Sequence, residues 1–328
     1  MAAKIRWGIL GTGNIAKQFA RGLQVVKDAR LVAVGSRAAD TANSFGDAFD
    51  VPNRHDSYEA LAADPDVDAI YVSTPHPFHA ANTILCLNAG KSVLCEKPFT
   101  INAAEAAKVI SLARRKKLFL MEAMWTRFVP AVIKTRELLE AGAIGEPRML
   151  FSDFGYAATL NPKWRHFDPA LGGGALLDVG VYPISFSSMI FGTPVKITGG
   201  AHLGITGVDE QSAYVLQGKA GQLSLLSSAI RTNTPQETTI MGTEGRIRLH
   251  SPSWRPSKLT LSRAGKPDKD FDLPFKGNGY NYEAVEVMAC MRAGKLESEV
   301  MPLDETISIM KTMDTLRAQW NFVYPSEK

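Results

Sequence analysis

Residues 4–16 read KIRWGILGTGNIA, a short apolar run that breaks at two glycines and then continues with helical character to Val26. The order of strand, glycine turn and helix start is the context in which G-x-G-x-x-[GA] binds a dinucleotide, although glycine turns also cap ordinary βα units. Gly11 makes the tight turn, Gly13 lets a pyrophosphate approach the backbone, and the small Ala16 lets helix and strand pack closely. The pattern predicts a nucleotide-binding βαβ unit.

Composition excludes several classes of function. The 328 residues exceed the usual length of one domain, which predicts two. Charge is nearly balanced, with 37 basic and 33 acidic residues, and the basic run at 114–117 falls where a helix should end. We therefore expect no nucleic-acid partner.

The cysteines and the apolar segments bear on location. Cys86, Cys95 and Cys290 have no metal-ligand spacing and cannot all pair, so we expect no metal site and a reducing compartment. No signal core is visible, and no apolar stretch looks long enough to cross a bilayer. These observations predict a cytoplasmic protein with no membrane partner.

Residues 1–122 alternate apolar strands with helical segments, which predicts a doubly wound parallel sheet of the α/β Rossmann type. Such a sheet binds its ligand at the carboxyl ends of its strands. The predicted strands after the first are residues 31–35, 69–73, 92–95 and 119–121, and the predicted helices are 41–45, 57–63, 79–89 and 103–116.

Residues 123–328 have a different pattern, in which strands dominate. This half predicts an α+β domain with an open, mainly antiparallel sheet, one apolar helix at 175–191 and closing helices at 282–293 and 303–320. The segment 265–279 reads as a mobile surface loop. Because helices would cover one face only, we expect a homodimer that buries the other face.

The end of the second predicted strand indicates which nicotinamide cofactor binds. An acidic residue there would bond the ribose hydroxyls of NAD, but this chain has Ser36-Arg37. A hydroxyl beside a guanidinium suits a 2′-phosphate, because arginine binds phosphate through two parallel hydrogen bonds. The alternative is that Arg37 projects into solvent or stacks on the adenine of NAD. We predict NADP, with NAD possible.

Two further motifs carry candidate chemistry. Glu96-Lys97-Pro98 follows a predicted parallel strand, where a lysine can take part in proton chemistry, although a surface ion pair before a proline would look the same. Further on, a glycine turn precedes an apolar helix in which Asp178 and Tyr182 are four residues apart and share a face. The alternative is a buried Asp–Tyr hydrogen bond that only orders the structure.

Together these motifs resemble one family over essentially the whole chain. The chain is similar to the glucose–fructose oxidoreductase / inositol dehydrogenase (Gfo/Idh/MocA) family of two-domain sugar-type dehydrogenases. The resemblance is carried by the glycine turn, Glu96-Lys97-Pro98, Trp164-Arg165 and the run from Gly172 to Tyr182. The branch it resembles most is that of the dimeric dihydrodiol dehydrogenases and NADP-dependent D-xylose dehydrogenases, through residues 118–128, 172–182 and 251–254.

The resemblance implies that Lys97 and Tyr182 are the catalytic pair, with Asp178 orienting the substrate hydroxyl or Lys97. Many family members have histidine in place of Tyr182, and the tyrosine agrees with the branch named. Removing hydride from a carbinol requires loss of the hydroxyl proton, and a nearby ammonium favours the phenolate that accepts it. Which of the two side chains takes the proton directly stays open at this point.

The remaining candidates surround these groups. We predict that the cofactor is bound by Gly11, Gly13, Asn14, Ile15, Ser36, Arg37, Thr74, Pro75, His76, His79, Glu96, Lys97, Trp125, Arg127, Trp164 and Arg165. His76 and His79 can equally be structural. For the substrate pocket the candidates are Tyr156, Trp125, Arg127, Phe154, Asp178 and Tyr182. Aromatic rings with a few polar groups suit a sugar or an aromatic diol.

These expectations define a function. They describe an NADP-dependent oxidoreductase that moves hydride between the nicotinamide and a hydroxyl carbon of an aldose, such as D-xylose or D-glucose, or of a trans-dihydrodiol. The alternatives are a sugar-ketone reductase of the 1,5-anhydrofructose reductase type and a sugar–sugar oxidoreductase that retains its cofactor. A third is a non-catalytic NADP-binding regulator. We assign residues 1–122 to the NADP-binding domain and 123–328 to the substrate-binding and dimerisation domain.

Overall fold

The computed structural model describes residues 4–328, and within them the chain forms two compact units. The first unit comprises residues up to Thr100, Ala104–Trp125 and Lys276–Thr306. The second comprises Ile101–Ala103, Thr126–Phe275 and Ile307–Lys328. The predicted division after residue 122 stays a prediction, and it differs from this grouping by assigning residues 276–306 to the second domain.

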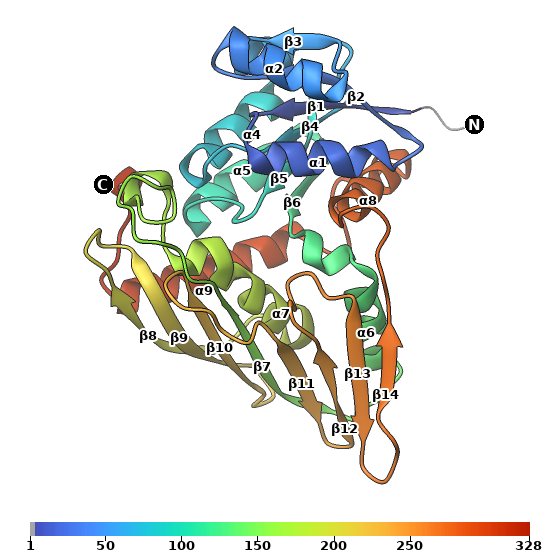
Figure 1. Ribbon diagram of the computed structural model, residues 1–328, viewed down its shortest axis with the longest axis vertical. Helices are drawn as coiled ribbons and strands as arrows, with labels where there is room; N and C mark the ends of the chain where they lie inside the picture. Colours follow the sequence, from blue (N-terminus) through green and yellow to red (C-terminus); the bar gives the residue numbers. More distant parts are fainter. Residues whose placement is uncertain (1–3) are drawn as a thin grey trace. The chain divides into compact units, whose positions relative to one another are not determined.

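A six-stranded parallel sheet forms the centre of the first unit (Figure 1). Its strand order is β3-β2-β1-β4-β5-β6, the order of the Rossmann fold. The strands β2 and β3 are added on one side of β1, and β4 to β6 on its other side. This confirms the predicted doubly wound sheet. The strands are β1 (Ile5–Leu10), β2 (Ala29–Gly35), β3 (Asn53–His55), β4 (Ala69–Val72), β5 (Ser92–Glu96) and β6 (Leu120–Ala123).

Helices flank this sheet, and the one added late in the chain was not expected there. Gly22 on α1 lets the first turn of α8 come close, because a Cβ at Gly22 would lie 3.0 Å from the amide nitrogen of Asn281. The helices are α1 (Asn14–Gln24), α2 (Ala39–Phe49), α3 (Tyr58–Ala63), α4 (His79–Asn88), α5 (Ala103–Lys116) and α8 (Tyr280–Arg292).

The second unit is built on an eight-stranded sheet with the order β14-β13-β12-β11-β7-β10-β9-β8. Among the described strands of this sheet only β7 and β10 pair in parallel, so the sheet is mainly antiparallel, as predicted. Its strands are β7 (Pro147–Gly155), β8 (Lys196–Leu203), β9 (Asp209–Gln217), β10 (Leu223–Ala229), β11 (Thr238–Gly242), β12 (Gly245–Leu249), β13 (Lys258–Arg263) and β14 (Lys269–Asp272).

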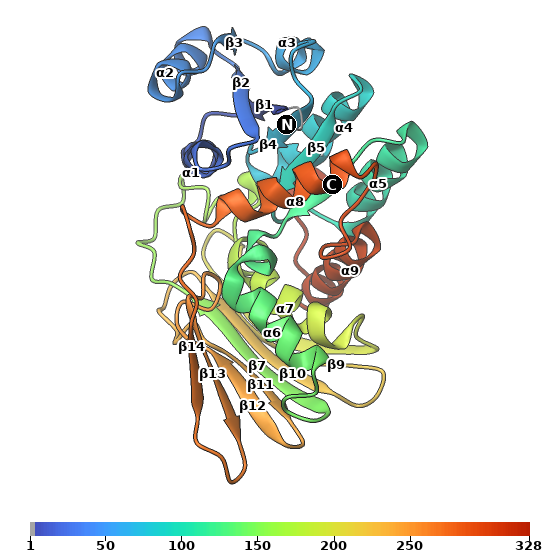
Figure 2. The ribbon, with the colours of Figure 1, turned by 90° about the vertical axis from the view of Figure 1, so that its right-hand side faces the viewer.

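The helices α6 (Pro130–Glu140) and α7 (Val181–Phe191) pack against one face of this sheet (Figure 2), and α9 (Leu303–Gln319) closes the chain. The predicted apolar helix differs in its first turns, because Leu176–Gly180 is a π-helical turn that leads into α7. Single π turns occur often at functional sites. Asp178 lies within this turn and Tyr182 lies in the first turn of α7.

Two sequence-based expectations were wrong. The segment predicted as a mobile loop contains β14, which pairs with β13 in antiparallel register and places Phe271 beneath the ammonium groups of Lys134 and Lys269. The apolar run Pro169–Phe191 is long enough to cross a membrane by length and composition, contrary to expectation, but 83% of its most apolar window is buried inside the protein. Packing against β7 and β10 accounts for that composition.

Candidate active site

The glycine turn between β1 and α1 has an open backbone. Gly11 has a φ of +103°, which favours glycine, and its N–H donates to the carbonyl of Gly35 at 2.9 Å. Gly13 precedes α1 without any side-chain cap, and a Cβ placed on it would meet nothing within 4 Å. A pyrophosphate needs such an approach to an uncapped helix N-terminus, so these residues fit a dinucleotide.

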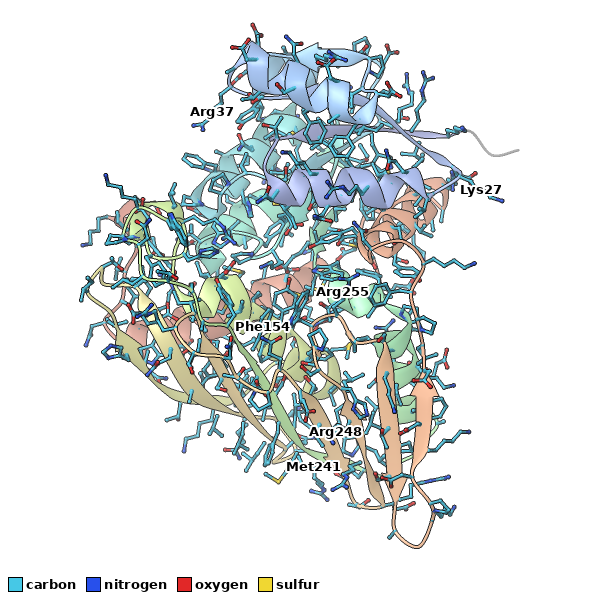
Figure 3. All side chains as sticks on the ribbon, in the orientation of Figure 1. Lys27, Arg37, Phe154, Met241, Arg248 and Arg255 are labelled. Carbon is cyan, nitrogen blue, oxygen red and sulfur yellow. The ribbon has the colours of Figure 1, made fainter. Side chains whose placement is uncertain are left out.

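The end of β2 presents a hydroxyl and a guanidinium. Ser36 is buried, and its Oγ lies 2.5 Å from Thr41 Oγ1. Arg37 is exposed and projects outward from the chain (Figure 3). Burial raises the pKa of Tyr58, and the side chain of Arg37 opposes that rise, so the two side chains are neighbours.

Lys97 follows β5, where backbone and side-chain contacts hold it. It is half-buried, and its amide N–H donates to Glu96 Oε2 at 3.1 Å, while the hydroxyl of Tyr71 donates to the other oxygen of Glu96. His79 joins two loops, with Nδ1 at 2.8 Å from the carbonyl oxygen of Pro98 and Nε2 at 2.7 Å from that of Thr74. Both ring nitrogens of His79 are therefore within hydrogen-bond distance of backbone carbonyl oxygens in the two loops that contain candidate site residues.

Sequence reasoning missed two residues of the first unit, Tyr280 and Glu283. Trp125 is buried and stacks on Tyr280, with ring centroids 4.6 Å apart and planes inclined by 18°. Glu283, in the same first turn of α8, is fully buried, and within residues 4–328 neither of its carboxyl oxygens has a hydrogen-bond partner. Burial and the nearby Glu96 raise its pKa well above 4.5. These residues lie some 160 positions beyond Trp125 in the sequence, so only the fold brings them together.

The free energy of unfolding of the Glu283→Gln variant, compared with that of the parent protein, should increase as the pH rises. Because the pKa of Glu283 is raised in the folded state, the unfolded chain releases this proton at a lower pH than the folded protein does, so the folded state of the parent loses relative stability as the pH rises above about 4.5. The slope is about 1.4 kcal/mol per pH unit for one proton. Thermal unfolding at pH 5 and pH 8 should show a Tm difference in favour of Gln that widens at pH 8. A constant difference would contradict the assigned proton.

In the second unit, a charged and hydrogen-bonded cluster surrounds Asp178. This carboxyl is buried, and its Oδ2 accepts the hydroxyl of Tyr156 at 2.9 Å. Its Oδ1 accepts Arg165 Nη1 at 3.1 Å. Burial and the charge of Asp178 raise the pKa of Tyr156, so that tyrosine stays a hydroxyl donor. The alternative interpretation of the sequence concerned Asp178 and Tyr182, whereas this hydrogen bond joins Asp178 to Tyr156.

Tyr182 lies in an aromatic environment. Its ring centroid is 5.4 Å from that of Phe154, which in turn stacks on Trp254 at 5.3 Å with planes 3° apart. Phe154 lies near the end of β7 and Tyr156 directly follows that strand; Phe154 contacts Tyr182, and Tyr156 bonds to Asp178. The structure therefore brings four of the predicted substrate residues together. Trp254 was not among the site candidates, although its SPSW motif belonged to the resemblance.

Other candidates lie elsewhere or have other contacts. Arg127 is buried, and its guanidinium donates to the hydroxyl and carbonyl oxygens of Ser185 at 2.9 and 2.8 Å. Trp164 is 49% exposed. Lys97 and Trp125 belong to the first unit, and Arg127 and Tyr182 to the second. Their roles toward cofactor and substrate stay predictions. Among residues 4–328, no group of three or more His, Cys, Asp or Glu side chains is arranged to hold a metal ion.

Comparison with known proteins decides the family. Residues 5–124 match the model of the GFO/IDH/MocA oxidoreductase family with an NAD-binding Rossmann fold, and residues 132–248 match the C-terminal domain of that family. The chain belongs to the Gfo/Idh/MocA family. It is therefore an enzyme, an oxidoreductase that acts on CH–OH groups with a nicotinamide cofactor.

Three members of the Gfo/Idh/MocA family illustrate which proteins this chain is similar to. Trans-1,2-dihydrobenzene-1,2-diol dehydrogenase from Bos taurus is 37% identical and covers 99% of both chains. A 3-ketoreductase from Actinomadura kijaniata, crystallised with NADP and TDP-benzene, is 25% identical over 96% of this chain and 97% of its own, with a TM-score of 0.85. The aldose–aldose oxidoreductase from Caulobacter crescentus shares the fold, with a TM-score of 0.88 at 22% identity over 98% and 99% of the chains.

Proposed function

We propose that this protein is an NADP-dependent dehydrogenase that oxidises a hydroxyl carbon of a trans-dihydrodiol or an aldose. The observation that carries the proposal is the cluster of Asp178, Arg165 and Tyr156 beside Tyr182 and the stacked rings of Phe154 and Trp254. Such a cluster offers a flat apolar surface together with groups that bind hydroxyls. The name of the bovine relative supports the dihydrodiol.

Proton transfer falls to side chains of this chain. Oxidation breaks the O–H and C–H bonds of the carbinol, and a bound nicotinamide would supply the acceptor for the hydride. In the proposal Tyr182 accepts the hydroxyl proton and the ammonium of Lys97 stabilises its phenolate. Asp178, held by Tyr156 and Arg165, orients the substrate hydroxyl. In reduction Tyr182 returns the proton.

The cofactor half of the proposal rests on the first unit. The glycine turn with Asn14 and Ile15 accepts the pyrophosphate, and Ser36 with Arg37 binds the 2′-phosphate of NADP. The exposed guanidinium at the end of β2 and the absence of an acid in residues 34–38 support this assignment. NADP in the crystals of the related 3-ketoreductase supports it as well.

A substrate panel tests the reaction. Purified protein is incubated with NADP and the trans-dihydrodiol of benzene, D-xylose or D-glucose, and formation of NADPH is followed. We expect turnover with at least one of them. No turnover with any would reject the proposed substrates.

A second candidate is reduction of a sugar ketone with NADPH, which the structural likeness to a 3-ketoreductase favours. The same residues serve this direction, with Tyr182 as the proton donor. NADPH consumption with a ketose panel distinguishes it from the first proposal. A cofactor that stays bound through gel filtration would instead indicate a sugar–sugar oxidoreductase.

Three free, buried cysteines support a reducing, cytoplasmic location.

We propose that residues 123–328 also form a homodimer through the sheet face that the helices leave uncovered. Phe151, Leu225 and Val215 lie side by side on β7, β10 and β9, and they are 44%, 39% and 41% exposed. They line a groove of about 740 Å³, while the alternate residue Leu226 is buried on the helix side. Exposed apolar patches of this kind support self-association.

Leu225→Arg should convert the dimer to a monomer, because a charge in the centre of a symmetric apolar contact is introduced twice. Light scattering at micromolar concentration measures the mass. Ile205→Arg is the matched control, since Ile205 is 81% exposed and does not line the groove. A monomeric parent protein would refute the dimer.

A further inference from the structure

A buried carboxyl group from another element accepts a hydrogen bond from the start of the helical segment that contains Asp178 and Tyr182. Asp209, the first residue of β9, is fully buried. Its Oδ2 accepts the amide N–H of Leu176 at 2.7 Å, at the start of the π turn. Amide groups at a helix start have no partner within the helix, so a side-chain acceptor there holds the first turn in place.

A glycine makes this contact possible. A Cβ on Gly174 would lie 2.2 Å from Asp209 Oδ1, and Gly174 has a φ of +114°, so no other residue fits there without strain. The carbonyl oxygen of Gly174 in turn lies 3.4 Å from the amide nitrogen of Asp178, which donates to it. Asp209 thus bonds to Leu176 and lies against Gly174, and Gly174 in turn bonds to the backbone of Asp178.

The surroundings of Asp209 leave its carboxyl to this task. In the part of the chain that the structure describes, Oδ1 has no hydrogen-bond partner, and a nearby cation, Arg317, pairs with Asp314 and Glu327. Tyr324 and Tyr214 also face the carboxyl, and Tyr324 donates to the carbonyl of Gly173 at 2.8 Å while Tyr214 donates to that of Gly180. Burial raises the pKa of Asp209 to about 7.

We propose that Asp209 is a positioning residue for the reaction, which holds the Gly174–Leu176 turn and so sets the places of Asp178 and Tyr182. The inference rests on the proposed function for the roles of those two residues. Since either protonation state of Asp209 offers an oxygen to the Leu176 amide, the acceptor is required and the negative charge is not. An asparagine at position 209 should therefore still accept the hydrogen bond of the Leu176 amide, whereas a shorter side chain should not reach it.

The test compares Asp209→Asn with Asp209→Ser by steady-state kinetics and by binding of NADP. We expect the Asn variant to keep kcat within about threefold, and the Ser variant to lose about tenfold or more in kcat, because small misplacements of reacting groups are costly. The dissociation constant for NADP should stay unchanged in both, since the glycine turn, Ser36 and Arg37, which are proposed to bind its phosphates, belong to the first unit and Asp209 to the second. Asp168→Asn, which alters a cap of the preceding turn, is the control and should retain kcat.

Hydrogen–deuterium exchange in residues 172–182 supplies a readout that needs no substrate. Exchange should increase in the Ser variant and stay at the parental level in the Asn variant. Parental kcat and exchange in the Ser variant would overturn the proposal, as would equal losses of kcat in folded Asn and Ser variants. If the parent protein turns over no substrate, the proposed function fails, and the exchange experiment still decides whether Asp209 holds the turn.

Discussion

Tyr182→Phe should lower kcat by about 10²–10⁴ while the fold and the affinity for NADP are retained. The substitution deletes one hydroxyl from a buried ring that packs on Phe154, so packing is preserved. What is lost is the group proposed to exchange the proton with the substrate. Steady-state kinetics with the best substrate of the panel, together with NADP binding, measures both effects.

Lys97→Met should be at least as damaging to kcat, because it removes the ammonium proposed to stabilise the phenolate and a contact proposed to reach the nicotinamide ribose or the substrate hydroxyl. In the double variant the two losses should be strongly non-additive, as for groups that act as one unit.

Two matched controls test whether these losses are specific. Tyr282→Phe removes a hydroxyl that accepts the amide N–H of Lys276, and Lys108→Met removes an exposed ammonium on α5. Both should keep kcat. A Tyr182→Phe enzyme with near-parental kcat would assign the proton to Lys97 or water and leave the tyrosine as a packing residue.

Arg37→Ala should reduce the preference for NADP by tenfold or more. Hydrogen bonds from a guanidinium to a phosphate contribute about 1.5–3 kcal/mol, which corresponds to roughly tenfold or more in affinity. The KM for NADP should rise while that for NAD, which lacks the 2′-phosphate, stays close to the parental value. Comparing kcat/KM for both cofactors in parent and variant measures the change.

Arg30→Ala is the matched control, because Arg30 is an exposed arginine near the opposite end of the same strand. It should leave both KM values unchanged. Equal kcat/KM for NAD and NADP in the parent protein would reject the NADP preference itself.

Local patterns in the sequence were enough to predict both sheets. The alternation of strands and helices predicted the parallel sheet, and the period-two strands predicted the antiparallel one, because these patterns follow from which faces must be buried. The glycine turn was equally predictable, since its role depends on backbone conformation within a few residues. β14 was missed because its short strand between Gly265 and Gly279 gave only the composition of a loop.

The partners of the site residues were decided by tertiary structure alone. The sequence by itself determined the family, the dinucleotide turn and the candidate residues Lys97, Asp178 and Tyr182, because each lies in a contiguous motif. It contained no sign that Asp178 is held by Arg165 and Tyr156, or that Glu283 is buried with a raised pKa. Burial and charge pairing depend on residues that are distant in the chain, and only the folded packing brings those together.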